Sequence, residues 1–222
     1  MWCIPTVGAE FVACMEDVLD LYAEPYDPTR PVVCFDEASK QLIIEIRQAL
    51  SAKPGQVERF DCEYKRNGTR NLFMFLEPLI GWRHVEVTQR RTKKDWAHRM
   101  QWLVDEVYSE AICVRVVLDN LNTHTFSALY ETFEPAEANR ICKRLELHYT
   151  PKHGSWLNMA EIELSIFSRQ AWSKHIPDEE TLKCNIEIVE NERNSNNATV
   201  NWRFTSQDAR VKLQRLYPSL SH

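Results

Sequence analysis

Hydrophobic and polar residues alternate along this sequence with two periods, one typical of helices and one typical of strands. Apolar side chains recur every three or four positions in residues 10–23, which predicts an amphipathic helix with an acidic outer face. Short apolar runs predict five strands, at residues 32–35, 72–76, 84–88, 112–118 and 145–149. Helical spacing returns in four further stretches, at residues 93–110, about 124–144, about 156–174 and 178–192.

Turn signals separate several of these segments. Pro54-Gly55 and Asn67-Gly68 are hairpin cues, and Gly81 marks a turn between two predicted strands. The order of elements is a helix, a strand, several hairpin strands, and then helices that alternate with strands. We therefore expect an α/β fold with a mixed central β-sheet flanked by helices, and no second core.

Two of the predicted strands end in an aspartate, Asp36 and Asp119. If these strands are parallel neighbours, a right-handed crossover aligns their carboxyl ends, where open α/β sheets place ligand sites. A third acid is expected from the helix that begins near Trp156, where Glu161 and Glu163 point about 200° apart. Glu161 falls on an apolar stripe and Glu163 on a more polar face, so the pattern favours Glu161 as the glutamate that faces the sheet.

Three carboxylates without a histidine or cysteine cluster suit a hard cation such as Mg²⁺ or Mn²⁺. Two such ions on a phosphodiester would activate the attacking oxygen and stabilise the leaving oxygen. An acid at a strand end is, however, often a helix cap or a turn residue. The carboxylates by themselves therefore leave both interpretations open.

The composition narrows the class of protein. The chain has 222 residues, of which 44% are hydrophobic and 27% charged, and this excludes disorder as a global description. Its seven cysteines form no CxxC pair, which is typical of scattered reduced thiols rather than of disulfides or a zinc site. The sequence has no membrane-spanning apolar run, no visible secretory signal and no glycine-rich phosphate loop. We therefore expect a cytoplasmic protein.

Three motifs carry a family resemblance: VVCFDE, VVLDNLNTH and HYTPKHGSWLNMAEIE. Together they resemble the catalytic core of bacterial insertion-sequence transposases of the mariner superfamily, which have a DDE endonuclease domain. The resemblance implies a ribonuclease H-like fold, and it implies that Asp36, Asp119 and Glu161 form a catalytic triad that holds two Mg²⁺ or Mn²⁺ ions. The implied reaction is hydrolytic cleavage at transposon ends, followed by attack of the freed 3′-hydroxyl on target DNA. The implied partners are terminal inverted repeats and target DNA with a TA preference, bound by a homodimer at the bacterial nucleoid.

The sequence departs from these relatives in two ways. The 41 residues between Asp119 and Glu161 are more than is common in the superfamily, and the extra length in PAEANRICKRLE is expected to be a surface elaboration. About 35 residues precede Asp36, too few for the helix-turn-helix region with which relatives bind inverted repeats. We therefore expect residues 1–30 to be a leading helix and linker, residues 31–218 to be the DDE catalytic domain, and a separate helix-turn-helix segment to recognise the ends.

Residues beside the triad are candidates for supporting roles. Asn120 could orient Asp119, and His124 could contact the scissile phosphate or hold a carboxylate; the alternative is a helix cap followed by a first-turn histidine. Asn158 could bond the backbone of its turn or only cap the next helix. Glu37 is expected to be solvated or salt-bridged rather than a metal ligand.

Two groups of residues are candidates for DNA binding. The densest basic run comprises Arg90, Arg91, Lys93 and Lys94. The second group, just before the third acid, comprises Lys152, His153 and Trp156. The basic run would bind the DNA backbone or form a solvated helix start, and the second group would meet a phosphate and a splayed base. A role as a core anchor is slightly favoured for Trp156. Packing roles are expected for Trp82, Trp96, Trp102, Trp172 and Trp202.

The net charge of −5 at first argues against a nucleic-acid partner, but its distribution does not. Residues 1–38 hold eight acids and one base, whereas residues 81–104 hold six bases and two acids. Bound Mg²⁺ would offset part of the acidity. We therefore expect weak DNA binding with a strong dependence on salt.

Three functions remain open at this point. The motifs favour a transposase catalytic domain. The rival within enzymes is another ribonuclease H-like nuclease, such as a resolvase or an RNA-strand hydrolase. The non-enzymatic rival is a truncated remnant that only interacts with, or inhibits, a full-length transposase.

Overall fold

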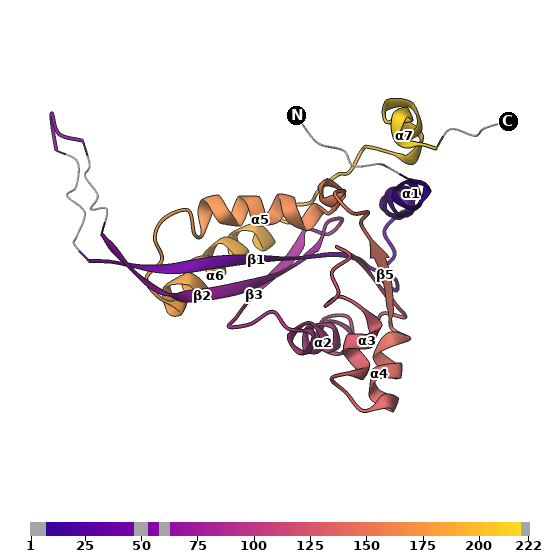
Figure 1. Ribbon diagram of the computed structural model, residues 1–222, viewed down its shortest axis with the longest axis horizontal. Coiled ribbons are helices and arrows are strands. Elements are labelled where there is room, and N and C mark those ends of the chain that lie inside the picture. Colours follow the sequence, from indigo (N-terminus) through magenta and orange to yellow (C-terminus); the bar gives the residue numbers. More distant parts are fainter. Residues whose placement is uncertain (1–7, 47–52, 58–62, 219–222) are drawn as a thin grey trace.

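The computed structural model describes residues 8–46, 53–57 and 63–218 (Figure 1). Its helices, strands and helical turns are α1 (Ala9–Ala23), β1 (Val32–Glu45), β2 (Tyr64–Glu77), β3 (Trp82–Thr88), α2 (Lys93–Trp102), the π-helical turn η1 (Leu103–Val107), β4 (Val114–Leu118), α3 (Phe126–Tyr130), α4 (Pro135–Cys142), β5 (Leu145–Tyr149), the 3-10 turn η2 (Ser155–Leu157), α5 (Met159–Gln170), α6 (Glu179–Ser195), α7 (Ser206–Lys212) and the 3-10 turn η3 (Gln214–Leu216).

The five strands form one mixed sheet in the order β3-β2-β1-β4-β5. β1, β2 and β3 pair antiparallel, whereas β4 is parallel to both β1 and β5. The expected α/β fold with a mixed, helix-flanked sheet is therefore confirmed.

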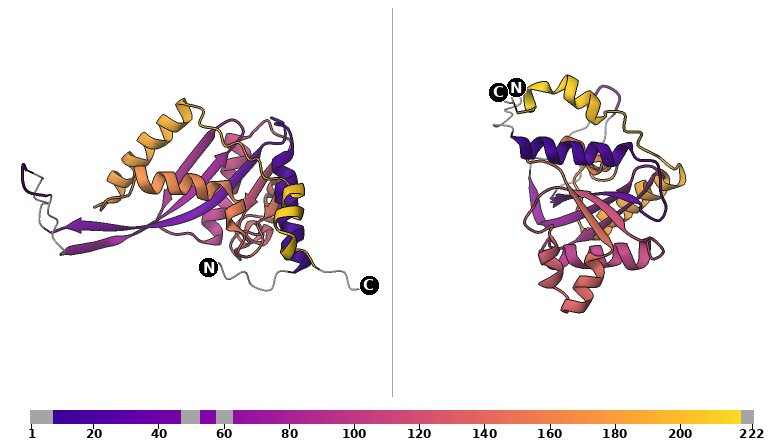
Figure 2. Two further views of the ribbon diagram at one scale, coloured as in Figure 1. Left: turned by 90° about the horizontal axis from the view of Figure 1, so that it is seen from above. Right: turned by 90° about the vertical axis from the view of Figure 1, so that its right-hand side faces the viewer.

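Side chains of the sheet alternate between two faces, and helices cover both of them. On one face, Cys34 and Met74 pack with residues of α1, α5 and α6. On the other face, Phe35, Phe73 and Phe75 pack with residues of α2, α3 and α4. Figure 1 shows α5 and α6 on the opposite side of the sheet from α2, α3 and α4, and Figure 2 shows α7 beside α1. Successive residues of β1 thus face different helices.

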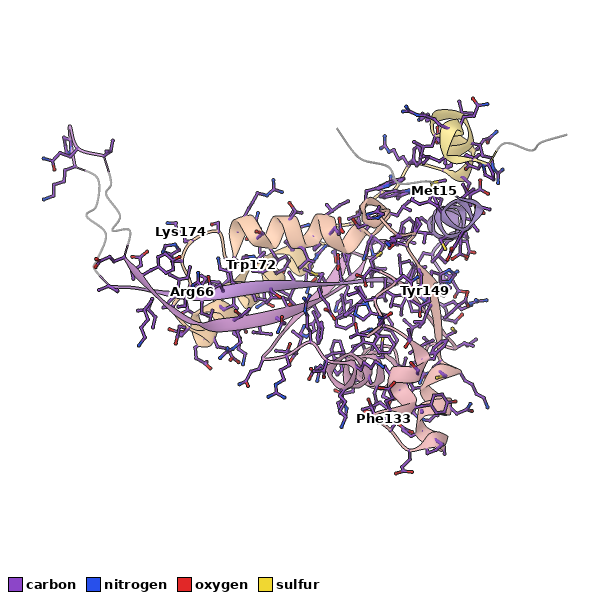
Figure 3. The ribbon with its side chains drawn as sticks, in the orientation of Figure 1. Met15, Arg66, Phe133, Tyr149, Trp172 and Lys174 are labelled. Atoms are coloured by element: carbon purple, nitrogen blue, oxygen red, sulfur yellow. The ribbon has the colours of Figure 1, made fainter. Side chains whose placement is uncertain are left out.

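β1 and β2 extend beyond the other strands as a two-stranded arm, on which Figure 3 labels Arg66. The turn predicted at Asn67-Gly68 is wrong, because both residues lie within β2. The pairing register shifts between Gln41 and Ile43 of β1, which leaves one extra residue on β2, and Gly68 has a φ of 88°. This is a β-bulge, in which glycine supplies the left-handed backbone that a turn would also use.

Other predicted elements differ in extent. α2 is followed by a π-helical turn, and the helical stretch predicted at about 124–144 forms two helices, α3 and α4. α4 contains most of PAEANRICKRLE, but the expectation of a surface elaboration is wrong, because Ala138 and Ile141 are fully buried in the core. The turn predicted at Pro54-Gly55 is present.

Side chains of α6 form hydrogen bonds with the backbone of the edge strand β3, on the side where no further described strand pairs. Asn194 Oδ1 accepts a hydrogen bond from the Arg83 backbone N–H at 2.9 Å, and Asn194 Nδ2 donates to the Arg83 carbonyl at 2.9 Å. Glu190 Oε2 accepts from the Val85 backbone N–H at 2.8 Å. Glu190 and Asn194 are four positions apart and so lie on one face of α6. α6 thereby protects the sheet edge and is fixed relative to β3.

The described cysteines, Cys14, Cys34, Cys113, Cys142 and Cys184, are all free. Cys3 and Cys62 lie outside the described residues. Across the described ranges, no helix is both long and apolar enough to cross a membrane.

Candidate active site

Asp36 and Asp119 approach each other because β1 and β4 are parallel neighbours, which was the condition that the sequence left open. Their pairing ends with Cys34 opposite Val117, two residues before each aspartate. β4 ends just before Asp119, but β1 continues well beyond Asp36. The prediction that Asp36 ends its strand is therefore wrong, because the antiparallel partner β2 keeps β1 extended after β4 has stopped.

An open groove of about 460 Å³ runs between β1 and α5. Its lining residues are Asp36, Glu37, Ala38, Ser39, Glu161, Leu164, Ser165, Ser168 and Trp172. Glu161 lies in the first turn of α5 and is exposed. Asp36 and Glu161 thus lie on the two walls of the same groove, and Figure 3 labels Trp172, which follows α5.

The charge around Asp36 is strongly negative. Burial raises the pKa of Asp36 to about 7, and the nearby carboxylates of Glu161, Asp119 and Glu37 contribute to the rise. The backbone N–H of Glu37, 2.7 Å from Asp36 Oδ1, opposes it. Asp36 is therefore close enough to both other acids predicted from the sequence, Asp119 and Glu161, to be repelled by each.

This donor set fits a hard divalent cation. Carboxylate oxygens are the ligands that Mg²⁺ and Mn²⁺ prefer, and a cation would relieve the repulsion that raises the pKa of Asp36. Among the residues that the structure describes, no three His, Cys, Asp or Glu side chains are grouped closely enough to hold a metal ion as they now lie.

His124 is buried next to Asp119 and is held at both ring nitrogens. Its Nδ1 lies 2.6 Å from Asp119 Oδ1, and its Nε2 lies 2.9 Å from Glu37 Oε1. The ring meets Phe35 edge-on at 5.2 Å and stacks on Trp96 at 5.9 Å. Only 1% of the side chain is exposed, so His124 holds carboxylates and has no surface for a phosphate.

Glu37 is a buried, ion-paired carboxylate. Its side chain is 4% exposed, bonds to His124 and lies 3.7 Å from Arg91 Nη1. The expectation of a salt bridge is confirmed and that of solvation is wrong. Burial lowers the pKa of His124, but hydrogen bonds to Asp119 and Glu37 outweigh it and raise that pKa to about 9. Successive side chains of a strand point to opposite faces of the sheet, so Glu37 must face away from Asp36. This alternation was a sequence signal for the contact between Glu37 and His124.

Asn158 ties the start of α5 to β1: the expected capping role is present, but the other backbone group that it bonds belongs to β1 rather than to its own turn. Its Oδ1 accepts a hydrogen bond from the Ala160 backbone N–H at 3.1 Å, which caps α5. Its Nδ2 donates to the Phe35 carbonyl at 2.8 Å. Because Phe35 precedes Asp36 and Glu161 lies in the first turn of α5, this side chain links the two walls of the groove.

The faces predicted for Glu161 and Glu163 are wrong. Glu163, expected on a polar face, is fully buried beside Arg83 and Arg193, whereas Glu161 is exposed. A buried carboxylate needs partners, and these two arginines come from β3 and α6, far away in the sequence. Local periodicity does not reveal them.

The remaining candidates lie on the surface. Asn120 is exposed and does not hydrogen-bond to Asp119 in the described structure. Arg90, Arg91 and Lys94 are exposed, and Lys93 pairs with Glu131 at 2.7 Å. Lys152 and His153 are exposed too.

Trp156 is a partly exposed packing residue rather than a core anchor. It is 36% exposed, stacks on Trp202 at 6.4 Å and meets Phe204 at 6.0 Å. Of the other tryptophans with predicted packing roles, Trp96 and Trp172 are buried, and Trp82, Trp102 and Trp202 pack partly buried against the core. One face of Trp156 is therefore fixed while part of the ring meets solvent.

Comparisons with known proteins place the fold. Similar solved structures include a pre-cleavage Mos1 transpososome, with a TM-score of 0.61 and 11% identity over 100% of this chain and 68% of that chain. The Mos1 mariner paired end complex with Mn gives a TM-score of 0.59 and 13% identity over 97% of this chain and 63% of that chain. The Mos1 strand transfer complex gives a TM-score of 0.57 and 14% identity over 85% of this chain and 56% of that chain. At such identities the likeness shows the fold alone, which is the expected ribonuclease H-like fold.

The chain spans between 56% and 68% of the length of these Mos1 chains. A search of curated proteins gives no match. A family model described as DDE superfamily endonuclease matches residues 31–183, which is more than half of the chain. The chain therefore belongs to the DDE superfamily endonucleases.

Proposed function

We propose that this chain is the catalytic domain of a DNA transposase, which cleaves DNA at transposon ends and transfers the freed strand into target DNA. The observation that carries the proposal is that Asp36 and Glu161 line one open groove of a DDE endonuclease domain, with Asp119 near enough to Asp36 to raise its pKa. The solved Mos1 complexes of similar fold, which their titles describe as paired end and strand transfer complexes, support it.

The three carboxylates are assigned as the catalytic residues, which would hold two Mg²⁺ or Mn²⁺ ions. Bound ions of this kind activate an attacking oxygen and stabilise a leaving one. The titles of two similar Mos1 structures name Mn and Mg. His124 and Asn158 are buried and do not line the groove, so they would keep Asp119 and α5 in place.

The form of the groove suits a polymer better than a small molecule. Small-molecule pockets are mostly apolar and enclosed, whereas this groove is open and six of its nine lining residues are carboxylates or serines. Water would be the first nucleophile and a DNA 3′-hydroxyl the second. No covalent bond between protein and DNA is then required.

The proposal extends to the DNA contacts. Arg90, Arg91, Lys93 and Lys94 would contact the backbone beside the groove. Lys152, His153 and Trp156 would contact a phosphate and an unstacked base. Asn120 would orient Asp119 when DNA is bound.

The finer assignments rest on the sequence motifs. They are a bacterial insertion sequence, a TA target, a homodimer on paired inverted repeats, a separate helix-turn-helix segment and a location at the nucleoid. Residues 1–30 would be the leading helix and linker, and residues 31–218 the catalytic domain.

The test is DNA nicking by the Asp119→Asn variant, on duplex that carries the sequences flanking the gene. The amide keeps an acceptor for His124 but loses the charge, so the fold should survive while Mg²⁺-dependent nicking falls about 1000-fold or more. Asp105→Asn, at an exposed ion pair with Arg140, is the control and should nick at the wild-type rate. Unchanged nicking by Asp119→Asn would refute the assignment.

The same assay separates the rivals. Cleavage of an RNA–DNA hybrid without cleavage of DNA duplex would favour another ribonuclease H-like nuclease. A folded wild-type chain that binds transposon ends but cleaves neither substrate would favour the remnant.

A further inference from the structure

A buried ion cluster joins α5 to β3 and α6. Glu163 and Arg83 have fully buried side chains, and Arg83 Nε lies 2.9 Å from Glu163 Oε1. Arg193 of α6 contacts both carboxylate oxygens, with Nη2 donating to Glu163 Oε2 at 2.9 Å and Nε donating to Oε1. One carboxylate is therefore shared by two guanidinium groups from two different elements.

The arginines are themselves fixed. Arg83 Nη1 donates to the Gly81 carbonyl at 2.7 Å, and Nη2 donates to the Ala198 carbonyl at 2.5 Å. Asn194, which follows Arg193 on α6, bonds both backbone polar groups of Arg83. The side chain of Glu163 is thus bound by two arginines that have little freedom to move.

Stability alone does not explain such a cluster. Charged groups are costly to take out of water, and well-packed apolar residues of similar volume are often at least as stable. What the cluster does is restrict the arrangement of its elements, because Glu163 would be left unpaired if α5 turned away. The rotation of α5 about its own axis is the quantity that it fixes.

That rotation also sets the direction of Glu161. Two positions along a helix correspond to about 200°, so Glu161 and Glu163 point to nearly opposite sides of α5. Glu163 is held towards β3 and α6, and Glu161 lies on the side of the groove wall opposite Asp36. β2 lies between β3 and β1 in the sheet. Glu163 therefore faces the side of α5 towards β3, and Glu161 faces the side towards β1.

We propose that Arg83, Glu163 and Arg193 are positioning residues, which hold Glu161 opposite Asp36 by fixing the rotation of α5. They do not line the groove, and they act only through Glu161. The inference rests on the proposed function, because it takes Glu161 as a carboxylate that holds the metal ion.

The test uses Arg193→Met in the full chain, because Arg193 is the most exposed member of the cluster, at 20%. The affinity for Mn²⁺ is measured from the rise in melting temperature with added Mn²⁺, and Mg²⁺-dependent nicking is measured beside it. We expect the apparent dissociation constant for Mn²⁺ to rise about 10-fold, as for other residues that orient metal ligands. Arg193→Lys keeps the charge and one contact, so it should remain folded and show a smaller rise.

Arg210→Met is the matched control. Arg210 of α7 makes a comparable two-pronged contact with Glu16 of α1, at 2.8 and 2.7 Å, away from α5. The control should leave the response to Mn²⁺ unchanged.

A double-mutant cycle with Glu161→Gln decides between positioning and general destabilisation. If Arg193 acts through Glu161, then Arg193→Met weakens Mn²⁺ binding only when Glu161 is present. An equal loss in both backgrounds, or wild-type Mn²⁺ affinity in both Arg193 variants, overturns the inference while the proposed function stands. If Glu161→Gln alone changes neither Mn²⁺ affinity nor nicking, the assignment of Glu161 in the proposed function fails, and the inference fails with it.

Discussion

The ring of His124 is held by two carboxylates and two aromatic rings, which leave it one orientation. In that orientation one oxygen of Asp119 is occupied, while the Asp119 side chain remains 34% exposed. The contact therefore fixes the direction of Asp119 without covering it. A carboxylate that is to hold a metal ion needs both properties.

At this scale we predict the effect of His124→Gln. Glutamine cannot reach both acids or carry a charge between them, so the free energy of unfolding should fall by about 3 kcal/mol. Mg²⁺-dependent nicking by the folded fraction should fall about 10- to 100-fold. Urea denaturation and the nicking assay measure the two effects.

His148→Gln is the control for this prediction. His148 also lies between two acids, Asp17 at 2.8 Å and Glu146 at 3.0 Å, but both of those are about half exposed. The loss of stability there should stay below about 1 kcal/mol, because water screens exposed pairs. Equal losses of nicking in the two variants would contradict a specific role for His124.

At the scale of elements, periodicity predicted correctly those segments whose buried faces consist of apolar residues. The five strands and the meeting of Asp36 with Asp119 follow from apolar runs and from the crossover rule. The faces of α5 did not follow, because Glu163 is buried by arginines that lie far away in the sequence. The bulge at Gly68 was mistaken for a turn because both use the same left-handed backbone.

The contact between β3 and α6 leads to a prediction about pH. His84 of β3 lies 3.0 Å from Glu190 of α6 and 3.5 Å from Glu86. Burial lowers the pKa of His84, but hydrogen bonds to the two glutamates raise it to about 9. The unfolded value is about 6.5, so the charged ring stabilises the fold fully below about pH 6.5, and this contribution is lost as the pH rises through about 9.

We therefore expect wild type to exceed His84→Gln in free energy of unfolding by an amount on the order of 1–3 kcal/mol at low pH, and by much less once the pH passes the folded pKa. Urea denaturation of both proteins across this pH range measures the difference. A difference that stays constant with pH would show that the charge of His84 contributes nothing.

At the scale of the whole molecule, part of the acidity of the first 38 residues is paired within the fold. Three of its acids pair with arginines of other segments, as Glu16–Arg210, Glu24–Arg115 and Glu37–Arg91. The basic run, by contrast, keeps unpaired positive charge. Arg90 and Lys94 are exposed and form no ion pair with any described residue. The net charge of −5 is thus a poor guide to the field near the basic run.

This distribution predicts how DNA affinity depends on salt. Each phosphate contact contributes about 0.9 to the slope of log K against log salt concentration, because it releases condensed counterions. Lys94→Ala should therefore lower the slope by about 0.9, and Lys143→Ala should leave it unchanged. Lys143 is also exposed, but it lies just before β5, at the opposite end of that strand from Tyr149, which pairs with Leu118 next to Asp119. Fluorescence anisotropy of a labelled duplex between about 50 and 200 mM salt measures the slopes. Equal slopes for the two variants would mean that DNA reaches the carboxylates without crossing the basic run, whereas a smaller slope for Lys94→Ala alone places the duplex across the start of α2, on the side of Glu37.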